Sequence, residues 1–295
     1  MKTPLFTGSN VAIVTPMHED GSINFEKLGQ LIEFQIKGGT SAITICGTTG
    51  ESATLKDDEH LAAIKYTVEK AAGRIPVIAG TGSNDTAHGI ELSKEAASYG
   101  ADGLLLVTPY YNKCTSRGLI RHYTQMVDAA GIPAILYNVP SRTGVSTTVS
   151  VYKELSRHPL VNGVKEASGS TDIVLRTMAA CGDELNIWSG NDSQIVPFMA
   201  MGAKGVISVA ANIVPEKVAE IANACLTGDY KKAAAMQVQY MDLIDTLFCE
   251  VNPIPVKTAL NLMGMDAGPL RMPLCEMDDG NLARLRVSLA ALKLI

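Results

Sequence analysis

The chain has 295 residues, 46% of them hydrophobic, which is enough apolar material for a sizeable buried core. Its formal net charge is −5 and its acidic and basic residues are interspersed, so neither a nucleic-acid surface nor an anionic-membrane surface is indicated. The first ten residues lack the apolar core of a signal peptide, and no apolar run approaches the ~18 residues of a membrane span.

Eight short apolar runs, most of them with β-branched residues, predict eight strands. Each run is apolar throughout and does not alternate with polar residues, which is typical of strands that are buried on both faces. The predicted strands span residues 10–16, 41–46, 75–82, 103–109, 132–140, 160–168, 186–192 and 205–212.

Segments with helical periodicity separate these strands. Residues 57–73 have acidic residues in their first turn and Gly73 at their end, and residues 84–100 end at Gly100 in the same way. This alternation predicts an α/β fold, a (β/α)8 TIM barrel, whose usual size is about 250 residues. A doubly wound parallel sheet is the alternative, but it usually has fewer strands, and no GxGxxG follows the first strand here.

Beyond Pro215 only helical segments follow. They are predicted at residues 215–227, 229–250, about 254–264 and 278–293. The first of these closes the barrel and the other three form an extension. We therefore divide the chain into a catalytic barrel, residues 1–227, and a C-terminal helical extension, residues 228–295.

Six cysteines occur, at positions 46, 114, 181, 225, 249 and 275. None forms a CxxC pair, and none stands at a zinc-like spacing from a histidine. We therefore expect free thiols and no metal site, in a protein of the cytoplasm.

The C-terminal ends of the predicted strands are rich in small polar and reactive residues, and active sites of (β/α)8 barrels are built at these ends. The second strand runs into GTTGES at 47–52, the fourth into TPYYN at 108–112 and the fifth into YNVPSRTG at 137–144. The sixth carries Lys165 within GVKEASG, and the seventh ends in SGND. Lys165 is therefore expected to face a site and not an ordinary loop.

An amine in such a site can attack a ketone and form a Schiff base. The free pKa of a lysine is about 10.4, and burial in an apolar barrel mouth would lower it. Tyr137 is a candidate proton carrier, and Thr48 and Thr49 could hold a carboxylate through hydroxyl and backbone N–H groups. Taken singly, Tyr137 fits a barrel wall, GTTGE a helix-initiating turn and Arg142 a surface charge, but their shared rim favours a site.

The motifs GTTGES, TPYYN, YNVPSRTG and GVKEASG, in this order and on these strands, make the chain similar to the dihydrodipicolinate synthase family. That family belongs to the pyruvate-dependent class I aldolases, which include N-acetylneuraminate lyase. The resemblance covers nearly the whole chain, and RTG after YNVPS points to the synthase branch. It implies an enzyme that needs no cofactor and condenses pyruvate with L-aspartate semialdehyde through a lysine Schiff base. The product, 4-hydroxy-tetrahydrodipicolinate, lies on the diaminopimelate route to lysine.

The resemblance also assigns the chemical steps to particular residues. Lys165 would form the imine with pyruvate, and Tyr137 would relay protons to and from it. Thr49 would link Tyr137 to Tyr111 in a chain of hydroxyls, with Tyr111 reaching in from a neighbouring subunit. The working unit would be a homodimer, paired into a homotetramer.

Substrate binding would depend on a second group of residues. Thr48 and Thr49 would bind the pyruvate carboxylate, and Arg142 would hold the carboxylate of L-aspartate semialdehyde. An arginine suits a planar carboxylate because it can donate two parallel hydrogen bonds. Gly190 and Ile207 would line the site through main-chain groups.

Some members of the family are inhibited by lysine, and the resemblance places their effector pocket at a dimer interface. The matching positions here are Ser52, Ala53, Asp57, His60, Asn84, His88 and Tyr110. Inhibited members tend to carry His where this chain has Asp57 and Glu where it has His88. A carboxylate for the effector's ammonium group is thus missing, and we predict that L-lysine does not inhibit appreciably.

Two alternatives are kept beside this interpretation. A sibling aldolase could use the same lysine to cleave N-acetylneuraminate or a 2-keto-3-deoxy sugar acid, but Arg142 disfavours a polyhydroxylated substrate. A barrel that binds small keto acids without turnover is the other alternative, and the set of Lys165, Tyr137 and Thr49 weighs against it.

Overall fold

The computed structural model describes residues 2–295 and contains a closed barrel of eight parallel strands. Each strand pairs with the next one along the chain, and β8 pairs with β1, so that no strand edge is left open. The strands are β1 Gly8–Ala12, β2 Ala42–Ile45, β3 Val77–Gly80, β4 Gly103–Val107, β5 Ala134–Asn138, β6 Val161–Glu166, β7 Asn186–Ser189 and β8 Gly205–Ser208. The (β/α)8 TIM barrel predicted from the sequence is confirmed.

Every predicted strand is present, but each of the eight predictions runs past the C-terminal end of the real strand. Residues 209–212, for example, were counted with the eighth strand and fall largely in a 3₁₀ turn, η5 Ala210–Asn212. The residues of this turn are buried, so their apolar character reflects packing at the barrel mouth and not strand pairing. Hydrophobicity alone therefore could not locate where the strands end.

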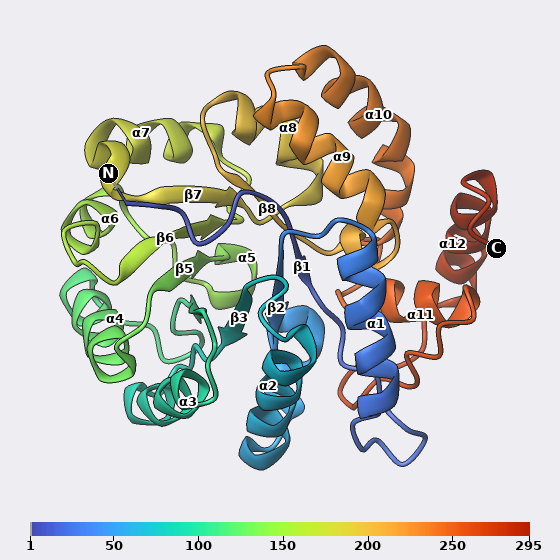
Figure 1. Cartoon of the computed structure of the whole chain (residues 1–295), viewed down its shortest axis with the longest axis horizontal. Helices are drawn as coiled ribbons and strands as arrows, with labels where there is room; N and C mark the ends of the chain where they lie inside the picture. The colour runs from blue at the N-terminus through green and yellow to red at the C-terminus, as the bar shows by residue number, and fades with distance from the viewer. Residues whose placement is uncertain (1) are drawn as a thin grey trace.

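Helices surround the outside of the barrel and, at the C-terminal end of the chain, extend beyond it (Figure 1). They are α1 Phe25–Lys37, α2 Asp57–Ala71, α3 Thr86–Ser98, α4 Ser116–Ala130, α5 Pro140–Thr143, α6 Val149–Leu155, α7 Thr171–Cys181, α8 Ile195–Ala200, α9 Pro215–Leu226, α10 Tyr230–Thr246, α11 Ile254–Leu262 and α12 Asp279–Ala291. Short 3₁₀ turns are η1 Thr48–Gly50, η2 Ser52–Thr54, η3 Gly182–Glu184 and η4 Asp192–Gln194. Side chains of Asn24, Thr115 and Asp229 cap three of the helices by accepting a backbone N–H from their first turn.

Two layers of apolar side chains hold the barrel together. One fills the interior of the barrel, and the other lies between the strands and the surrounding helices. Inside, Phe6 stacks on Trp188 with 5.0 Å between ring centres, and the indole N–H donates to the Phe6 carbonyl at 3.3 Å. The segment before β1 runs across the barrel to reach its strand (Figure 1). Its aromatic stack fills the N-terminal end of the barrel, and the open end is left for the site.

The segment after α9 forms three helices, as predicted from the sequence. Helix α10 packs against α8 and α9, and α12 packs against α10 and α11. Figure 1 shows α12 at the periphery of the molecule, away from the ring of barrel helices. Because α10 shares its packing with the last barrel helices, a domain boundary at residue 228 stays a prediction.

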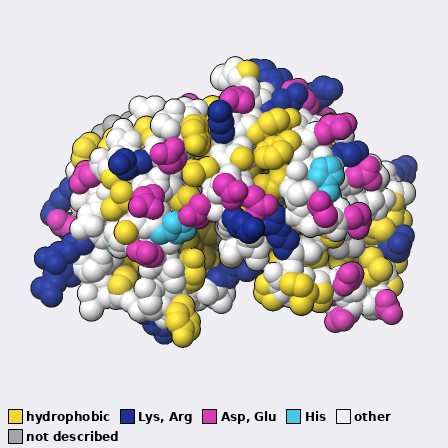
Figure 2. Space-filling model, turned by 90° about the horizontal axis from the view of Figure 1, so that it is seen from below, with side chains coloured by type: hydrophobic (Ala, Val, Ile, Leu, Met, Phe, Trp, Pro, Cys, Tyr) yellow, Lys and Arg dark blue, Asp and Glu magenta, His cyan; other side chains and the backbone are white. Residues whose placement is uncertain are grey.

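The surface agrees with the mixed charge of the sequence. On the face seen in Figure 2, lysine and arginine side chains are interspersed with aspartate and glutamate, and no continuous basic surface appears. No helix in the part of the chain that the structure describes is long and apolar enough to cross a membrane.

Candidate active site

The polar segments that follow the strands meet at one end of the barrel around a cavity of about 170 Å³. Six of the eight residues expected at the site line this cavity: Thr48, Thr49, Tyr137, Arg142, Lys165 and Gly190. Segments that lie more than 200 residues apart in sequence, from Ala12 to Asn252, contribute to its wall. The prediction that these strand ends converge on one rim is therefore confirmed.

Lys165 lies on β6 with its side chain inside the barrel, and Tyr137 is its register partner on β5. The Lys165 amine lies 4.4 Å from the centre of the Tyr137 ring, and the residue is only 5% exposed. Burial lowers the pKa of Lys165 to about 8; Asp192 acts in the opposite direction and Arg142 in the same direction. With a pKa of 8, roughly 9% of the amine is neutral at pH 7, compared with about 0.04% at its ordinary pKa of about 10.4.

Asp192 is the carboxylate whose negative charge raises the pKa of this amine, against the effect of burial. Its carboxylate is buried in η4, and Oδ2 accepts from the backbone N–H groups of Val209 and Ala210, both at 3.0 Å. Burial raises the pKa of Asp192, while hydrogen bonds from Ser208 and those N–H groups, and the charge of Lys165, lower it. The sequence showed SGND only as a polar strand end and did not reveal this role.

The hydrogen-bonding partner of the Tyr137 hydroxyl is Thr48. From the sequence, Thr49 was expected in this position. Burial raises the pKa of Tyr137, and the charge of Arg142 and the hydrogen bond with Thr48 lower it. The Thr49 hydroxyl instead accepts from the Asn252 amide at 3.1 Å. Successive side chains of a 3₁₀ turn point about 120° apart, so only one of the two threonines can face Tyr137. The structure thus places Thr48 where the hydroxyl chain was expected to pass through Thr49.

The turn η1, whose residues Thr48 and Thr49 line the cavity, also has backbone donors that are not used within the turn. The first backbone hydrogen bond of this turn joins Gly50 N to Gly47 O, so the N–H groups of Thr48 and Thr49 precede it and have no partner within the turn. Across the cavity, a Cβ added to Gly190 would lie 2.6 Å from the Ala167 Cβ, so only glycine fits there. Together these features leave room for a small carboxylate beside the Lys165 amine.

The C-terminal extension completes the rim. Arg142 on α5 is exposed, and its Nη2 donates to the Asn252 carbonyl at 3.0 Å. Asn252 and Phe248 line the same cavity, and the Asn252 side-chain oxygen is buried without a hydrogen-bond partner among residues 2–295. Sequence reasoning missed Asn252, since the segment VNPIPVK reads only as the approach to a helix.

Two expected site residues lie elsewhere. Tyr111 is 92% exposed, has a left-handed backbone with φ of 67°, and does not line the cavity of its own barrel. Ile207 is fully buried in the barrel interior on β8, in the same apolar cluster as Trp188, and does not line the cavity either.

A second cavity of about 410 Å³ adjoins the first, and Thr48, Arg142 and Asn252 line both. It contains most of the positions matched to an effector pocket: Ser52, Ala53, Asp57, His60, His88 and Tyr110. Asn84 lies next to it and donates to the Tyr110 carbonyl at 3.3 Å. In this cavity His88 Nε2 lies 2.9 Å from the Asp57 carboxylate. Asp57 stands where lysine-inhibited members tend to carry His, and its carboxylate is already engaged by the imidazole of His88.

Within residues 2–295, no group of three or more His, Cys, Asp or Glu side chains is arranged to hold a metal ion. All six cysteines have free thiols. The cavity is lined by the amine of Lys165 and by three residues that carry hydroxyl groups, Tyr137, Thr48 and Thr49.

A buried amine that lines a cavity at the mouth of a (β/α)8 barrel is the arrangement that a Schiff-base-forming class I aldolase requires. The sequence matches the Dihydrodipicolinate synthetase family over residues 5–292, and the chain belongs to that family. It is 56% identical over 284 residues to the 4-hydroxy-tetrahydrodipicolinate synthase of Thermoanaerobacter sp. strain X514, across 96% of this chain and 95% of the relative.

Solved structures agree. The dihydrodipicolinate synthase of Aquifex aeolicus superposes with a TM-score of 0.96 at 45% identity, over 98% of this chain and 99% of that one. A chloride-inhibited dihydrodipicolinate synthase from Acinetobacter baumannii, complexed with pyruvate, has a TM-score of 0.96 at 42% identity, over 98% and 99% of the two chains. The activity of the chain is 4-hydroxy-tetrahydrodipicolinate synthase activity, in lysine and diaminopimelate biosynthesis.

Proposed function

We propose that Lys165 is the nucleophile of this synthase reaction and forms a Schiff base with pyruvate. The observation that carries the proposal is the buried Lys165 amine, with a pKa of about 8, in a cavity of about 170 Å³ beside the Tyr137 ring. A cavity of this size accommodates a three-carbon keto acid, and the relative from Acinetobacter baumannii is complexed with pyruvate.

The first half of the reaction needs an amine, a proton carrier and an anion cradle. The neutral Lys165 amine attacks the ketone carbon, and the Tyr137 hydroxyl, hydrogen-bonded to Thr48, passes a proton to the leaving hydroxyl so that water departs. The turn that carries Thr48 and Thr49 binds the pyruvate carboxylate. The Tyr137 oxygen, which has given up its proton, then takes a proton from the methyl group and so converts the imine into an enamine.

The second half takes place at the mouth of the cavity. The enamine carbon attacks the aldehyde of L-aspartate semialdehyde, whose carboxylate is held by Arg142. The amino group of that substrate then attacks the imine carbon and displaces Lys165, which closes the ring of 4-hydroxy-tetrahydrodipicolinate. Asn252, whose carbonyl accepts from Arg142, fixes the guanidinium at this mouth.

Borohydride trapping tests the nucleophile. Treating the enzyme with pyruvate and borohydride should add one reduced pyruvyl group per chain, located on Lys165 by peptide mass mapping. L-Aspartate semialdehyde should then serve as the second substrate, while N-acetylneuraminate should not be cleaved. An adduct on any other lysine, or one that persists in Lys165→Ala, would show that the nucleophile is assigned wrongly.

We also propose that Tyr111 acts in the active site of a neighbouring subunit, within a homodimer that pairs into a homotetramer. The support is its exposure of 92% beside the half-exposed Tyr110, in a loop that leaves its own cavity without it. A hydroxyl chain from Tyr137 through Thr48 would end on this tyrosine.

Subunit mixing tests this arrangement. Tyr111→Phe and Lys165→Ala should each be nearly inactive alone, and mixed dimers should regain activity because one of their two sites has both residues intact. Proven subunit exchange without recovery would mean that Tyr111 does not act across the interface. The six free thiols support a reducing compartment, and we propose that the enzyme works in the cytoplasm.

A further inference from the structure

Glu51, the acidic residue of GTTGES, does not line the cavity that contains Lys165. Both oxygens of its carboxylate are taken by the C-terminal extension: Oε1 accepts from the Lys257 amine at 2.8 Å, and Oε2 accepts from the Arg271 backbone N–H at 2.9 Å. The residue is 4% exposed and adopts a left-handed backbone, with φ of 56°. The motif GTTGES, whose threonines were predicted to hold a carboxylate, therefore also contains a residue that fastens this loop to the C-terminal extension.

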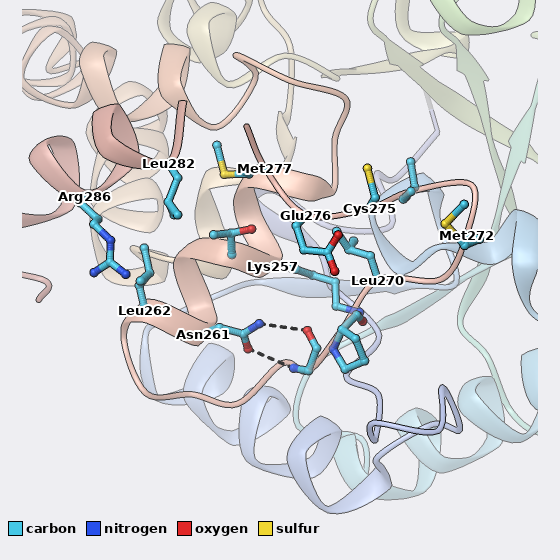
Figure 3. A pocket seen from close by; sticks show the side chains of 14 residues that line it. Lys257, Asn261, Leu262, Leu270, Met272, Cys275, Glu276, Met277, Leu282 and Arg286 are labelled. Carbon is cyan, nitrogen blue, oxygen red and sulfur yellow. Dashed lines mark hydrogen bonds between the residues drawn. The ribbon is translucent and has the colours of Figure 1, made fainter. Parts of the chain in front are cut away.

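Lys257 is the other half of this anchor. It lies on α11, and the side chains of Lys257 and Glu51 are each 1% exposed. A second hydrogen bond joins the Lys257 amine to the Pro269 carbonyl at 2.6 Å. Figure 3 shows Lys257 pointing from α11 toward the segment that begins at Gly268, which Asn261 holds by two further hydrogen bonds.

The contacts on either side of Glu51 also come from the extension. Asn252 donates to the Thr49 hydroxyl at 3.1 Å, and the Arg271 guanidinium donates to the Thr54 carbonyl at 2.7 Å. The loop from Thr48 to Thr54 is thus held at three points by residues that lie about 200 positions further along the chain. The first of these points is Thr49, which lines the cavity of Lys165 together with the preceding Thr48.

We propose that Glu51 and Lys257 are a positioning pair, which fixes the Thr48–Thr49 turn in the orientation that receives the carboxylate of pyruvate. The inference rests on the proposed role of that turn. Two buried charges are a poor source of stability, because well-packed apolar residues often stabilise a fold as well or better. The pair instead contributes a defined orientation of the loop, since each hydrogen bond between charged groups has a narrow preferred geometry.

The double variant Glu51→Gln/Lys257→Met separates positioning from stability. It removes both charges while nearly preserving shape, so the melting temperature should stay within about 5 °C of the parent. The KM for pyruvate should rise about tenfold while kcat falls less than about threefold, because the bound state is reached less often but reacts by the same route. A double variant with the parent's KM for pyruvate would overturn the proposal.

Should the double variant not fold, Glu51→Asp decides the question. It keeps the charge and shortens the side chain by one methylene, so it should fold and raise the KM for pyruvate by a smaller factor. An unchanged KM in a folded Glu51→Asp enzyme would overturn the proposal equally. Lys27→Met is the matched control, because Lys27 joins the same extension to α1 through Asp266 at 2.8 Å without touching the loop; its KM should not change.

Borohydride trapping at graded pyruvate concentrations keeps this inference separate from the proposed function. The parent should be trapped on Lys165, and the double variant should need about ten times more pyruvate for half-trapping on the same lysine. If the parent itself is not trapped on Lys165, the proposed function fails. If parent and double variant are trapped at equal pyruvate concentrations, only the positioning pair fails.

Discussion

The mouth of the barrel and its junction with the C-terminal extension each contain a buried lysine, and burial lowers the pKa of both amines. At the junction, the Lys257 amine is occupied by a carboxylate and a carbonyl within 2.8 Å. At the mouth, Lys165 faces the Tyr137 ring and a cavity, and no carboxylate of residues 2–295 lies within ion-pair distance of it. Burial alone therefore does not make a nucleophile; the amine must also have no fixed partner and have space for a substrate.

Replacing each lysine should have opposite consequences, and this is the largest expected effect. Lys165→Ala should lower kcat by more than about 1,000-fold and leave stability near that of the parent, because the cavity already surrounds the amine. Lys257→Ala should lower the free energy of unfolding by about 3–5 kcal/mol, because it leaves the Glu51 carboxylate buried without its counter-charge.

Steady-state kinetics and urea unfolding check this pair of outcomes. An active Lys165→Ala enzyme, or a Lys257→Ala enzyme as stable as the parent, would erase the distinction between the two lysines.

Arg142 lies between the two regions, since it lines the cavity and also donates to Asn252 of the extension. Arg142→Ala should leave borohydride trapping nearly intact and lower kcat/KM for L-aspartate semialdehyde by roughly 10- to 100-fold. That range corresponds to the loss of one charge-assisted contact, about 1.5–3 kcal/mol. Loss of trapping with an unchanged response to the aldehyde would instead assign the arginine to the pyruvate site.

The pH dependence of imine formation reports directly on the amine at the mouth. Only the neutral form attacks, so with a pKa of about 8 the rate at limiting pyruvate should rise about tenfold between pH 6 and 7 and level off above about pH 8. The charge of Asp192 raises the pKa of Lys165, so Asp192→Asn should move this profile to lower pH. Rapid-quench borohydride trapping across pH measures it, and a shift to higher pH would contradict the role given to Asp192.

The smallest effect is expected from L-lysine at the second cavity. A ligand ammonium group needs an acceptor or counter-charge, and here the Asp57 carboxylate is paired with His88. Lack of one charge-assisted hydrogen bond costs about 1.5–3 kcal/mol, which is roughly a 10- to 100-fold loss of affinity. Relative to an effector that binds at about 1 mM or just below, this places half-inhibition above about 10 mM. Calorimetric titration and activity at graded lysine concentrations test this. Half-inhibition below about 1 mM would identify Asp57 as the carboxylate that receives the effector.

The sequence revealed those features that depend on local pattern. Continuously apolar runs located all eight strands, and the place of Lys165 at a strand end identified the candidate nucleophile. Features that depend on three-dimensional arrangement were missed. Which of Thr48 and Thr49 faces Tyr137 is decided by the rotation of a short turn, and nothing in GTTGES encodes it locally.

Contacts between segments that are distant along the chain could not be predicted from the sequence either. Glu51 and Lys257 are 206 positions apart, and only the folded chain brings them to 2.8 Å. Asn252 belongs to a segment that the sequence presents as the start of a helix, yet it bonds with both Thr49 and Arg142. Long-range polar pairs have no periodicity that could reveal them in a single sequence.

The stack of Phe6 on Trp188 has a consequence for the order of events during turnover. Because the stack lies inside the barrel on the side of its N-terminal end, we expect both substrates to enter, and water and product to leave, through the C-terminal mouth. In the proposed reaction, pyruvate would be bonded to Lys165 at the bottom of the cavity before the aldehyde occupies the space above it. An aldehyde that entered first would block the way to Lys165, so the shared opening favours pyruvate as the first substrate to bind. Because water leaves on imine formation before the aldehyde binds, the proposed mechanism predicts the parallel-line kinetics of a ping-pong enzyme.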